Sequence, residues 1–529
     1  MQPRHWMENI AEDLARRGDA MLVFSTAKTP SGPIHVGVGR ELVYCSTFET
    51  ILRQRGFRTR FIFIVDDFDS LKNFPPSVPE GFKEHDEYLG RPMFMVPCPY
   101  GHCENWAAHY ANEFIETFPE FGFRPEVMWS HELYGTPEMK NLIRIALKRT
   151  ADLRRILNEI VAPTLSGPRL ESFAREMTDW HPCLVLCEKC QRLRFSEVSS
   201  YDAETDEVAY RCEACGYVGR VKVAEWLVKL RWRIDWPAKW ALFKVSCEPA
   251  GKDHCVKGGA YDTGEVICRD VFGWKGPYRI PYEWILLGDR AMKTHKGISF
   301  TFREWSAVAP TETYRYMMLR EDPRKHITFL PERIPQLLDE FERAELIYYN
   351  AEKASNMDEE RNVKTIYSHI LTQPPSPTPP RRFPYRFALI LVQLKPLLGE
   401  TGIMRKAEEV MKRLHNVEAL SDFDFQEIRS RLNRAEYWVA HYASDDMKFI
   451  VSETLTEEAK AKLDSTQKEA LKAIGEMLTT REWNEKELQY QIFEVGKTLG
   501  LGARIFEAAY YAFLSRNFGP RLAPFLLSL

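Results

Sequence analysis

The sequence lacks the features that mark membrane-spanning or secreted proteins. No stretch approaches the ~18 uninterrupted apolar residues that a transmembrane helix needs. Residues 1–20 mix acids with bases and contain no apolar core, so they do not form a signal peptide. Trp6, Ile10 and Leu14, spaced by four, indicate instead the buried stripe of an amphipathic helix. We therefore expect no membrane partner and a cytoplasmic location.

An excess of charge of one sign is also missing. The 529 residues include 72 Lys and Arg against 75 Asp and Glu, a formal net charge of −3. This balance removes any overall basic signal for nucleic acid, although a local basic face can still meet such a partner. A hydrophobic content of 44% is ordinary for a globular protein. The length exceeds what one core supports and predicts about three to four domains.

Cysteine is present eleven times, an odd number without secretory context, which favours reduced thiols and metal binding over disulfides. The strongest motif is a pair of knuckles, Cys187-x2-Cys190 and Cys212-x2-Cys215. This spacing suits one tetrahedral zinc held by four thiolates in a zinc ribbon, with Gly216 providing a left-handed turn. Four thiolates leave no open coordination position, so the zinc is expected to be structural. Cys183 and His181 lie close enough to act as substitute ligands.

The first ~150 residues alternate between strand and helix patterns, which predicts βαβ units and a doubly wound parallel sheet. Strands are expected over residues 22–24, 61–65, 93–96 and 127–129, with a helix over residues 36–53. Ligands of such sheets bind at the carboxyl ends of the strands, where Thr26–Gly37 and Asp66–Asp69 fall. The sheet pattern resumes over residues 226–285. After residue 310 or so, amphipathic helices follow, for example over 337–354 and 456–478, interrupted by a Pro-rich linker at 374–380.

Two segments at the carboxyl edge of this sheet contain candidate functional residues. The stretch TPSGPIHVGV, residues 29–38, leads from a turn into a helix and places His35 and free amides where an anion docks. Gly37 would let a planar nucleoside approach the backbone. A Pro/Gly loop with a surface histidine is the alternative. Asp66, Asp67 and Asp69 repel one another, so they require a cation, a helix-capping role or solvent.

A third group of candidates lies between residues 231 and 305. Aromatic and charged residues alternate in RWRIDWP, GKDH, YDTG and PYEW, and we expect them on short strands. Such residues can form a stacked pocket with acids for an ammonium group. The segment Met292–Gly297, with two lysines and a histidine, can close over phosphates, although a basic loop is often merely solvated.

Taken in order, these motifs resemble those of the class I lysyl-tRNA synthetases over nearly the whole chain. The segment TPSGPIHVGVGRE is similar to the family's ATP signature, written HIGH, and VDDFD, the zinc ribbon, RWRIDWPAKW, EPAGKDH, YDTG, PYEWI and a C-terminal GPRL also have counterparts. The resemblance implies a Rossmann-like class I catalytic domain with an inserted zinc ribbon, followed by an all-α anticodon-binding region. The expected parts are a catalytic domain in two halves (1–180 and 223–310), an inserted zinc ribbon (181–222), a helical connecting domain that contacts the tRNA stem (311–372) and a helical anticodon-binding domain (381–529).

The activity that the resemblance implies is that of a lysine–tRNA ligase. The carboxylate of L-lysine attacks the α-phosphorus of ATP to give lysyl-adenylate, and the lysyl group then passes to tRNA(Lys). ATP with Mg²⁺, a structural Zn²⁺ and a monomeric state are expected. Two alternatives stay open: a paralogue that activates lysine or a relative without charging tRNA, and a non-catalytic tRNA-binding protein.

Site residues follow from the same resemblance. His35, Lys293 and Lys296 are expected to be catalytic. The residues expected to bind ATP are Thr29, Ser31, His35, Gly37, Val38, Asp253, Met292, Lys293 and Lys296. Those expected to bind lysine are Ala27, Thr29, Trp232, Asp235, His254, Tyr282 and Glu283, with Asp235 and Glu283 as candidate partners of its ε-ammonium group.

Three positions depart from the family pattern. Val38 stands where the ATP signature often has a polar residue, and Ala27 stands where the pocket loop tends to have glycine. The second class I signature, KMSKS, appears as AMKTHKG over residues 291–297. If it is aligned on Met292 and Lys296, its first lysine has become Ala291; if it is shifted by two residues, Lys293 and Lys296 restore the Lys-x-x-Lys spacing. Both registers remain open.

Overall fold

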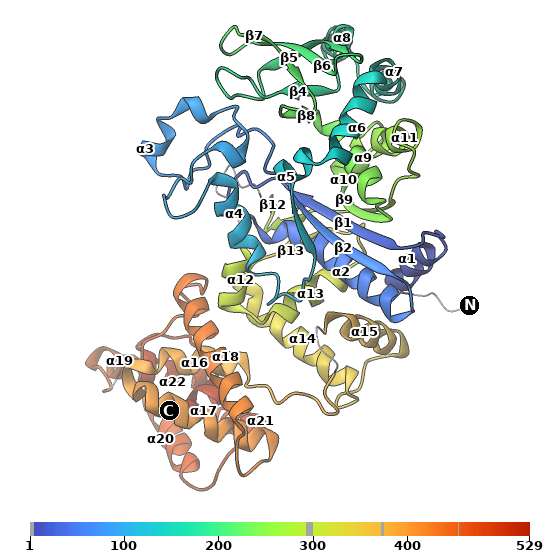
Figure 1. The fold of residues 1–529 in the computed structure, drawn as a ribbon. Coiled ribbons are helices and arrows are strands. Elements are labelled where there is room, and N and C mark those ends of the chain that lie inside the picture. The colour runs from blue at the N-terminus through green and yellow to red at the C-terminus, as the bar shows by residue number, and fades with distance from the viewer. Residues whose placement is uncertain (1–4, 293–299, 372–374, 453) are drawn as a thin grey trace. The chain divides into compact units, whose positions relative to one another are not determined.

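A computed structural model describes residues 5–292, 300–371, 375–452 and 454–529 (Figure 1). The chain divides into two compact units. Unit 1 comprises Met1–Trp305, Tyr314–Phe329 and Asn356–Pro374, and unit 2 comprises Ser306–Thr313, Leu330–Ser355 and Pro375–Leu529. The segment 311–372, expected as a connecting domain, is therefore shared between them. Within the described residues, no helix combines the length and the apolarity needed to cross a bilayer.

Unit 1 is built on a five-stranded parallel sheet in the order β10-β9-β1-β2-β3. Its strands are β1 (Leu22–Lys28), β2 (Thr59–Val65), β3 (Glu126–Trp129), β9 (Cys247–Gly251) and β10 (Tyr278–Tyr282). The strand order reverses between β1 and β9, which creates a crevice at the carboxyl ends of the strands. The predicted doubly wound parallel sheet is confirmed, and its apolar strands are buried because helices cover both faces.

The two faces of the sheet carry different helices (Figure 1). Ile62 and Ile64 of β2 share a core with Trp240 of α9 (Trp232–Phe243) and with buried residues of α11 (Ala260–Asp270). The intervening Phe63 points the other way and contacts Phe114 of α4 (Trp106–Ile115) edge-on at 5.7 Å between ring centroids. The alternation of side chains along one strand thus anchors helices on both sides.

Several of the strands predicted from the sequence are wrong. Where a strand was expected over 93–96, Met93–Met95 form a 3₁₀ turn, because the amides of Met93 and Phe94 bond to the carbonyls of Asp69 and Asp67 in the loop after β2. The segment around RWRIDWP forms the helix α9 rather than a short strand, with Pro237 inside it. The segments GKDH and YDTG are likewise helical, in α10 (Lys252–Cys255) and α11. Helical geometry puts residues four apart on one face, so the tryptophans at 232, 236 and 240 contact one another in a row.

A β-rich insertion follows the helices α6 (Pro137–Lys148), α7 (Thr150–Val161) and α8 (Pro168–Thr178). Strand β4 (Cys183–Val185) pairs antiparallel with β8 (Val228–Leu230), and these two strands enclose the insertion. Between them, β5 (Ser196–Asp202), β6 (Glu207–Cys212) and β7 (Val218–Lys222) form an antiparallel meander. Figure 1 shows this module, in green, beside α7 and α8.

The segments around the sheet complete unit 1. Helix α1 (Trp6–Ala15) confirms the predicted amphipathic helix, but its buried residues are Met7, Ala11 and Leu14, whereas Trp6 and Ile10 are half-buried. A 3₁₀ turn, Val36–Val38, leads into α2 (Gly39–Gln54), as expected for residues 36–53. Strand β11 (Ile285–Leu287) pairs with β12 (Arg290–Ala291) and β13 (Ile327–Phe329). Further helices of this unit are α3 (Glu80–Lys83), α5 (Ser130–Gly135), α10 (Lys252–Cys255) and α15 (Met357–Ile370).

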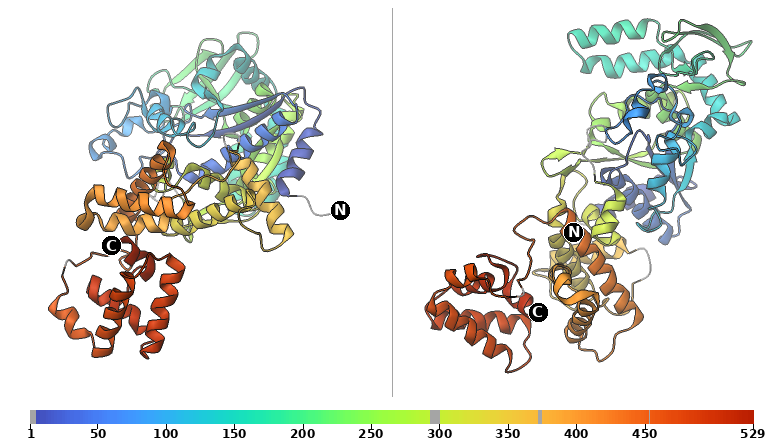
Figure 2. Two further views of the ribbon diagram at one scale, coloured as in Figure 1. Left: turned by 90° about the horizontal axis from the view of Figure 1, so that it is seen from below. Right: turned by 90° about the vertical axis from the view of Figure 1, so that its left-hand side faces the viewer.

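Unit 2 is helical, as predicted for the C-terminal region. Its helices include α14 (Ile334–Tyr348), α16 (Tyr385–Gln393), α17 (Lys395–His415), α18 (Asp422–His441), α19 (Glu457–Lys462), α20 (Ser465–Leu478), α21 (Glu485–Thr498), α22 (Arg504–Leu514) and α23 (Leu522–Ser528). The single helix expected over 456–478 is split, because Asp464 and Gln467 form a capping box that starts a new helix. Figure 2 shows α19–α22, in red, gathered as a group of their own within this unit.

Candidate active site and metal centres

A cavity of about 640 Å³ opens at the carboxyl edge of the central sheet in unit 1. The last residues of β1, β9 and β10 line it, which places it at the point where the strand order reverses. Its full lining is Ala27, Lys28, Thr29, His35, Gly37, Val38, Glu41, Asp66, Trp232, Trp236, Glu248, Pro249, Ala250, Gly251, Asp253, His254, Tyr282, Trp284, Ile285 and Met292. This is the position where ligands of doubly wound folds bind.

His35 lies at the start of the turn that leads into α2. Its Nδ1 accepts a hydrogen bond from the backbone N–H of Gly37 at 3.1 Å. Burial, and secondarily Lys28, lowers the pKa of His35 to about 4, so the ring is neutral at pH 7. Because Nδ1 is an acceptor, the proton of the neutral ring must sit on Nε2. His35 can therefore donate one hydrogen bond from Nε2 to an oxygen in the cavity.

Gly37 is small for a reason that the sequence did not reveal. A Cβ atom at this position would lie 2.7 Å from Nδ1 of His35. Any side chain would therefore displace the imidazole ring from its cap position. Gly37 thus fixes the ring, whether or not it also admits a nucleoside.

Lys28 and Glu41 face the cavity from β1 and α2. Glu41 accepts hydrogen bonds from the hydroxyls of Thr26 and Tyr282. Burial raises the pKa of Glu41, with Lys28 opposing the shift, and burial lowers the pKa of Lys28, with Glu41 opposing it. The two groups therefore stabilise each other's charged forms inside a poorly solvated site.

An aromatic wall from α9 borders the other side of the cavity. Trp232 and Trp236 stack with 5.5 Å between ring centroids and 22° between planes, and His254 lies 5.3 Å from Trp232. Behind this wall, Glu248 of β9 accepts from Trp236 Nε1 at 2.7 Å and from Trp240 Nε1 at 2.8 Å. Burial raises the pKa of Glu248 to about 7, although the two indole bonds oppose the shift.

The acids that follow β2 find their cations within the protein. Asp66 pairs with Lys239, and Asp69 pairs with Lys229 at 3.3 Å. Both lysines also bond to Asp235, at 2.8 Å from Lys229 and 2.9 Å from Lys239. Burial alone would raise the pKa of Asp235, but the two lysines outweigh it and lower the pKa to about 2. This network ties α9 and β8 to the end of β2 and to Thr29, whose hydroxyl donates to Asp69.

The structure brings ten of the predicted site residues together at the cavity: Ala27, Thr29, His35, Gly37, Val38, Trp232, Asp253, His254, Tyr282 and Met292. Ser31 is exposed and does not line the cavity. Lys293 and Lys296 lie outside the described residues.

The two acids predicted to meet an ammonium group have other partners. Both oxygens of Asp235 are taken, Oδ1 by the hydroxyl of Tyr134 and Oδ2 by the two lysines of the network. Glu283 lies outside the lining and pairs with Lys252 at 2.6 Å and with His326 at 3.1 Å. Sequence reasoning overlooked Lys28, Glu41, Trp236 and Glu248. A helical reading of RWRIDWP would have placed Trp236 on the same face as Trp232.

Four thiols converge in the β-rich insertion. The sulfur atoms of Cys187, Cys190, Cys212 and Cys215 all lie within 4.8 Å of one another. Two of the distances, Cys187 to Cys215 and Cys190 to Cys212, are 3.6 Å. A tetrahedral zinc with Zn–S bonds of about 2.3 Å requires sulfurs about 3.8 Å apart, so the donor set fits that ion. Gly216 has a φ of 72°, the left-handed conformation expected after the second knuckle.

A second group of ligands was missed from the sequence. Cys98, His102 and Cys103 in the loop before α4, together with His109 on that helix, have donor atoms within 4.8 Å of one another. Two thiols and two imidazoles are a zinc-type donor set. The signal was present as the spacing Cys-x3-His-Cys-x5-His. Cys183 and His181, considered as substitute ligands for the ribbon, belong to neither group.

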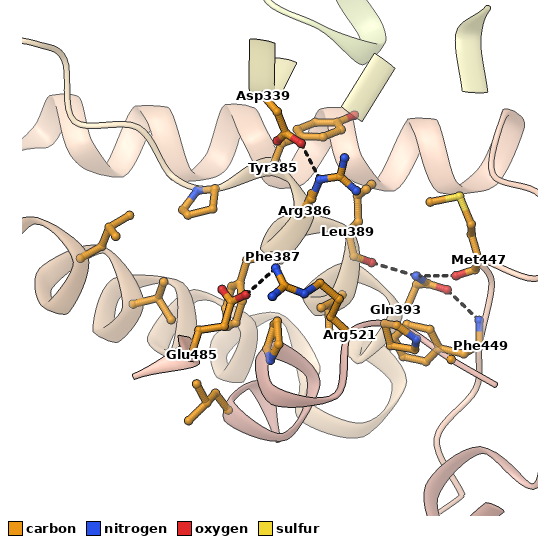
Figure 3. A pocket seen from close by; sticks show the side chains of 18 of the residues that line it. Asp339, Tyr385, Arg386, Phe387, Leu389, Gln393, Met447, Phe449, Glu485 and Arg521 are labelled. Carbon is orange, nitrogen blue, oxygen red and sulfur yellow. Dashed lines mark hydrogen bonds and ion pairs between the residues drawn. The ribbon is translucent and has the colours of Figure 1, made fainter. Parts of the chain in front are cut away.

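Unit 2 contains a cavity of its own, of about 620 Å³ (Figure 3). Aromatic and aliphatic side chains such as Phe387, Leu389 and Phe449 line it. Two ion pairs border it, Arg386 with Asp339 at 2.6 Å and Arg521 with Glu485 at 2.9 Å. These charged side chains are half-exposed, so they can exchange partners at little cost.

Comparison with known proteins gives consistent matches. Residues 4–371 match the family model described as tRNA synthetases class I (K). The lysine–tRNA ligase of Methanocaldococcus jannaschii is 35% identical over 99% of this chain and 97% of its own length, and that of Thermococcus kodakarensis is 36% identical with the same coverage. Among solved structures, a glutamate tRNA ligase from Elizabethkingia meningosepticum aligns over 96% of both chains at 14% identity with a TM-score of 0.38.

Proposed function

Because the chain belongs to the family of class I tRNA synthetases (K), we propose that it is a lysine–tRNA ligase. The observation that carries the proposal is the unbroken similarity to archaeal lysine–tRNA ligases at 30–36% identity over 99% of the chain. The cavity supports it with a neutral histidine at the start of a helix, an aromatic wall and buried acids. ATP, L-lysine and tRNA(Lys) are the proposed substrates, and the cytoplasm is the proposed location.

In the activation step, a carboxylate oxygen of lysine forms a bond to the α-phosphorus of ATP. The bond from that phosphorus to the bridging oxygen breaks, and pyrophosphate leaves. His35 donates from Nε2 to a phosphate oxygen, and Lys28 supplies positive charge beside it. Such fixed donors stabilise charge that develops in the transition state, so catalysis here is mainly positioning and electrostatics.

The signature loop is proposed to supply the remaining positive charge. Lys293 and Lys296 are its only lysines, and His295 lies between them. Alanine at either lysine is expected to lower the activation rate about 10²-fold while leaving lysine affinity nearly intact. Similar losses at both positions favour the shifted register, whereas a dominant loss at Lys296 favours alignment on Met292. If the double alanine variant forms lysyl-adenylate at the wild-type rate, the loop takes no part in the activation step.

In the transfer step, a ribose hydroxyl of the terminal adenosine of tRNA attacks the lysyl carbonyl, and AMP leaves. We propose that unit 2 meanwhile holds the anticodon. Its cavity can take an unpaired base, because aromatic faces and guanidinium planes stack on bases without needing a duplex. Arg521 belongs to the GPRL segment and borders that cavity, which makes it the first residue to test.

Zinc is proposed at both ligand clusters. The four thiolates of Cys187, Cys190, Cys212 and Cys215 close the coordination sphere, so this ion would hold the ribbon together rather than take part in the reaction. Cys98, His102, Cys103 and His109 would likewise fix the loop before α4. Magnesium is proposed to arrive with ATP, because it binds mainly phosphate oxygens and water and needs no protein cage.

Exchange of radioactive pyrophosphate into ATP tests the proposal. Lysine-dependent exchange is the expected result. A paralogue without transfer activity would exchange but leave tRNA(Lys) uncharged, and a non-catalytic RNA-binding protein would not exchange with or without tRNA. The absence of exchange under both conditions would overturn the proposed activity.

A further inference from the structure

We propose that Arg40 is a positioning residue for the activation step, because it holds the small sheet β12-β11-β13 against helix α2. The inference rests on the proposed function and concerns a part of the cavity other than the aromatic wall of α9. Arg40 belongs to the segment TPSGPIHVGVGRE, and its side chain is fully buried in unit 1. It does not line the cavity, so it can act on a ligand only through the residues that it holds.

The guanidinium group of Arg40 joins α2 to two segments that are distant in sequence. Its Nη1 donates to the carbonyl oxygen of Glu283 at 2.5 Å and to that of Lys325 at 3.2 Å. Its Nη2 donates to the carbonyl oxygen of Asp322 at 3.3 Å. Its Nε donates to the hydroxyl of Tyr44 at 2.7 Å, one turn further along α2. Three of the four bonds therefore reach main-chain atoms outside the helix.

The charge of Arg40 has no carboxylate partner in the described part of the chain. Asp322 offers it a carbonyl oxygen, while the carboxylate of Asp322 pairs with Arg324 at 2.9 Å. A buried charge without a counter-ion is costly, so packing alone does not account for an arginine here. The property that the position uses is the rigid fork of the guanidinium group, which holds several acceptors at fixed distances.

The segments that Arg40 holds carry a second wall of the cavity. The three carbonyls belong to the junction of β10 with β11 and to the turn that precedes β13. Strand β11 pairs with both β13 and β12, so the two contacts fix one small sheet. Trp284, Ile285 and Met292, which belong to this sheet or flank it, form the second wall and line the cavity. Arg40 thus fixes the second wall relative to the turn with His35.

The side of the cavity expected to bind lysine depends less on this clamp. Strand β10 is held in the central sheet by its pairing with β9. Tyr282, whose ring centroid lies 5.7 Å from Cζ of Arg40, is also bonded to Glu41 of α2. Loss of the clamp should therefore displace Met292 relative to Val38, the two residues expected to contact ATP from either side. A displacement of about 1 Å can lower a rate about 10²-fold, because the reacting groups lose their alignment.

The test compares the full-length wild type with Arg40→Lys and two control variants. Arg315→Lys is the matched control: Arg315 is also buried in unit 1 and bonds to Ser46 and Thr47 of α2, but its third bond goes to a carbonyl of α15. Tyr44→Phe removes only the bond within α2. Calorimetry gives the dissociation constants of ATP alone and of L-lysine alone. Thermal unfolding gives the melting temperature, and rapid quench gives the rate of lysyl-adenylate formation.

Arg40→Lys should weaken ATP about 10-fold and lower the rate of lysyl-adenylate formation about 10²-fold, because one ammonium group cannot hold three carbonyls in place. Its affinity for lysine should stay within about threefold of wild type. Arg315→Lys should lower the melting temperature by a similar amount but leave both affinities and the rate within about threefold, as should Tyr44→Phe. This separation of ATP from lysine is what a merely stabilising arginine would not produce.

Wild-type ATP affinity in Arg40→Lys, equal losses for ATP and lysine, or equal losses of ATP in Arg40→Lys and Arg315→Lys would each overturn the inference. If Arg40→Lys does not fold, the wild type decides. ATP should then slow hydrogen exchange at the N–H of Ile327, which bonds to the carbonyl of Trp284 at 3.2 Å, and no slowing would contradict the inference. Wild-type protein without lysine-dependent pyrophosphate exchange would instead refute the proposed function.

Discussion

At the scale of single residues, the site depends on which groups are charged. His35 is buried and neutral, with its proton on Nε2. Glu41 and Lys28, in contrast, stabilise each other's charged forms inside the cavity. Of the acids that follow β2, Asp66 is paired with Lys239 and Asp69 with Lys229. Residues that line the cavity and residues held in ion pairs thus lie close together, and the two kinds differ in the partners that their side chains contact.

His35→Ala should lower the rate of lysyl-adenylate formation about 10²-fold, because it removes one donor to the phosphate in the transition state. Affinity for lysine should stay within about threefold, since the aromatic wall is untouched. Pre-steady-state measurement of adenylate formation separates the two effects. His85→Ala, at an exposed histidine paired with Glu87, is the control. A variant with a normal rate would mean that His35 only caps its turn.

The sequence predicted the positions of some of these residues better than the contacts of others. Thr29, His35 and Tyr282, predicted near one another, do line one cavity at the edge of the sheet, because strand ends and turn residues are local signals. The partners of Asp235 could not be predicted, because Lys229 and Tyr134 reach it only through tertiary packing, and Lys239 faces it only when their segment is a helix. One alternative for Asp66, Asp67 and Asp69 was pairing with a cation, and Asp66 and Asp69 do pair with lysine side chains.

At the scale of elements, the largest error concerned α9. Alternating aromatic and charged residues were interpreted as short strands, but the period of four in Trp232, Trp236 and Trp240 is helical. Pro237 favoured the prediction of a strand, because proline usually disrupts a helix. The convergence of the four ribbon cysteines was more predictable, because the spacing within each Cys-x2-Cys knuckle indicates a tight turn. The cluster at Cys98 mixes loop and helix ligands and follows a less regular spacing.

The purified protein should contain two zinc ions per chain by mass spectrometry. Cys212→Ser and Cys103→Ser should each reduce the content to about one, because serine is a much poorer ligand. Loss of the ribbon zinc should also lower the melting temperature, since metal binding stabilises such small modules. Cys183→Ala, at a buried cysteine of β4 outside both clusters, is the control that keeps both ions. Zinc-free wild-type protein would contradict both sites.

At the scale of the whole molecule, each of the two units contains a cavity of its own. The cavity with His35 and Glu248 lies within unit 1, and a second cavity bordered by Arg386 and Arg521 lies within unit 2. The helical character of the C-terminal region was predictable from its amphipathic patterns. Residues 306–313 and 330–355 also belong to unit 2, an assignment that depends on contacts distant in sequence.

Arg521→Ala should therefore reduce tRNA charging without affecting amino-acid activation. Removal of one stacking or charged contact to a nucleotide is expected to lower kcat/KM for tRNA(Lys) about 10-fold. Pyrophosphate exchange without tRNA should be unchanged. Arg405→Ala in α17, at an exposed arginine that does not line the cavity, is the matched control. Equal effects of both variants would indicate general electrostatic attraction rather than a specific site.

The central claim is that this chain charges tRNA with lysine. The most direct measurement is the accumulation of radioactive lysyl-tRNA from purified full-length protein, ATP, L-lysine and a tRNA(Lys) transcript. The account predicts charging of tRNA(Lys) with lysine and none when norleucine replaces it. Normal pyrophosphate exchange without any charged tRNA, from a transcript that another lysine–tRNA ligase does charge, would contradict it.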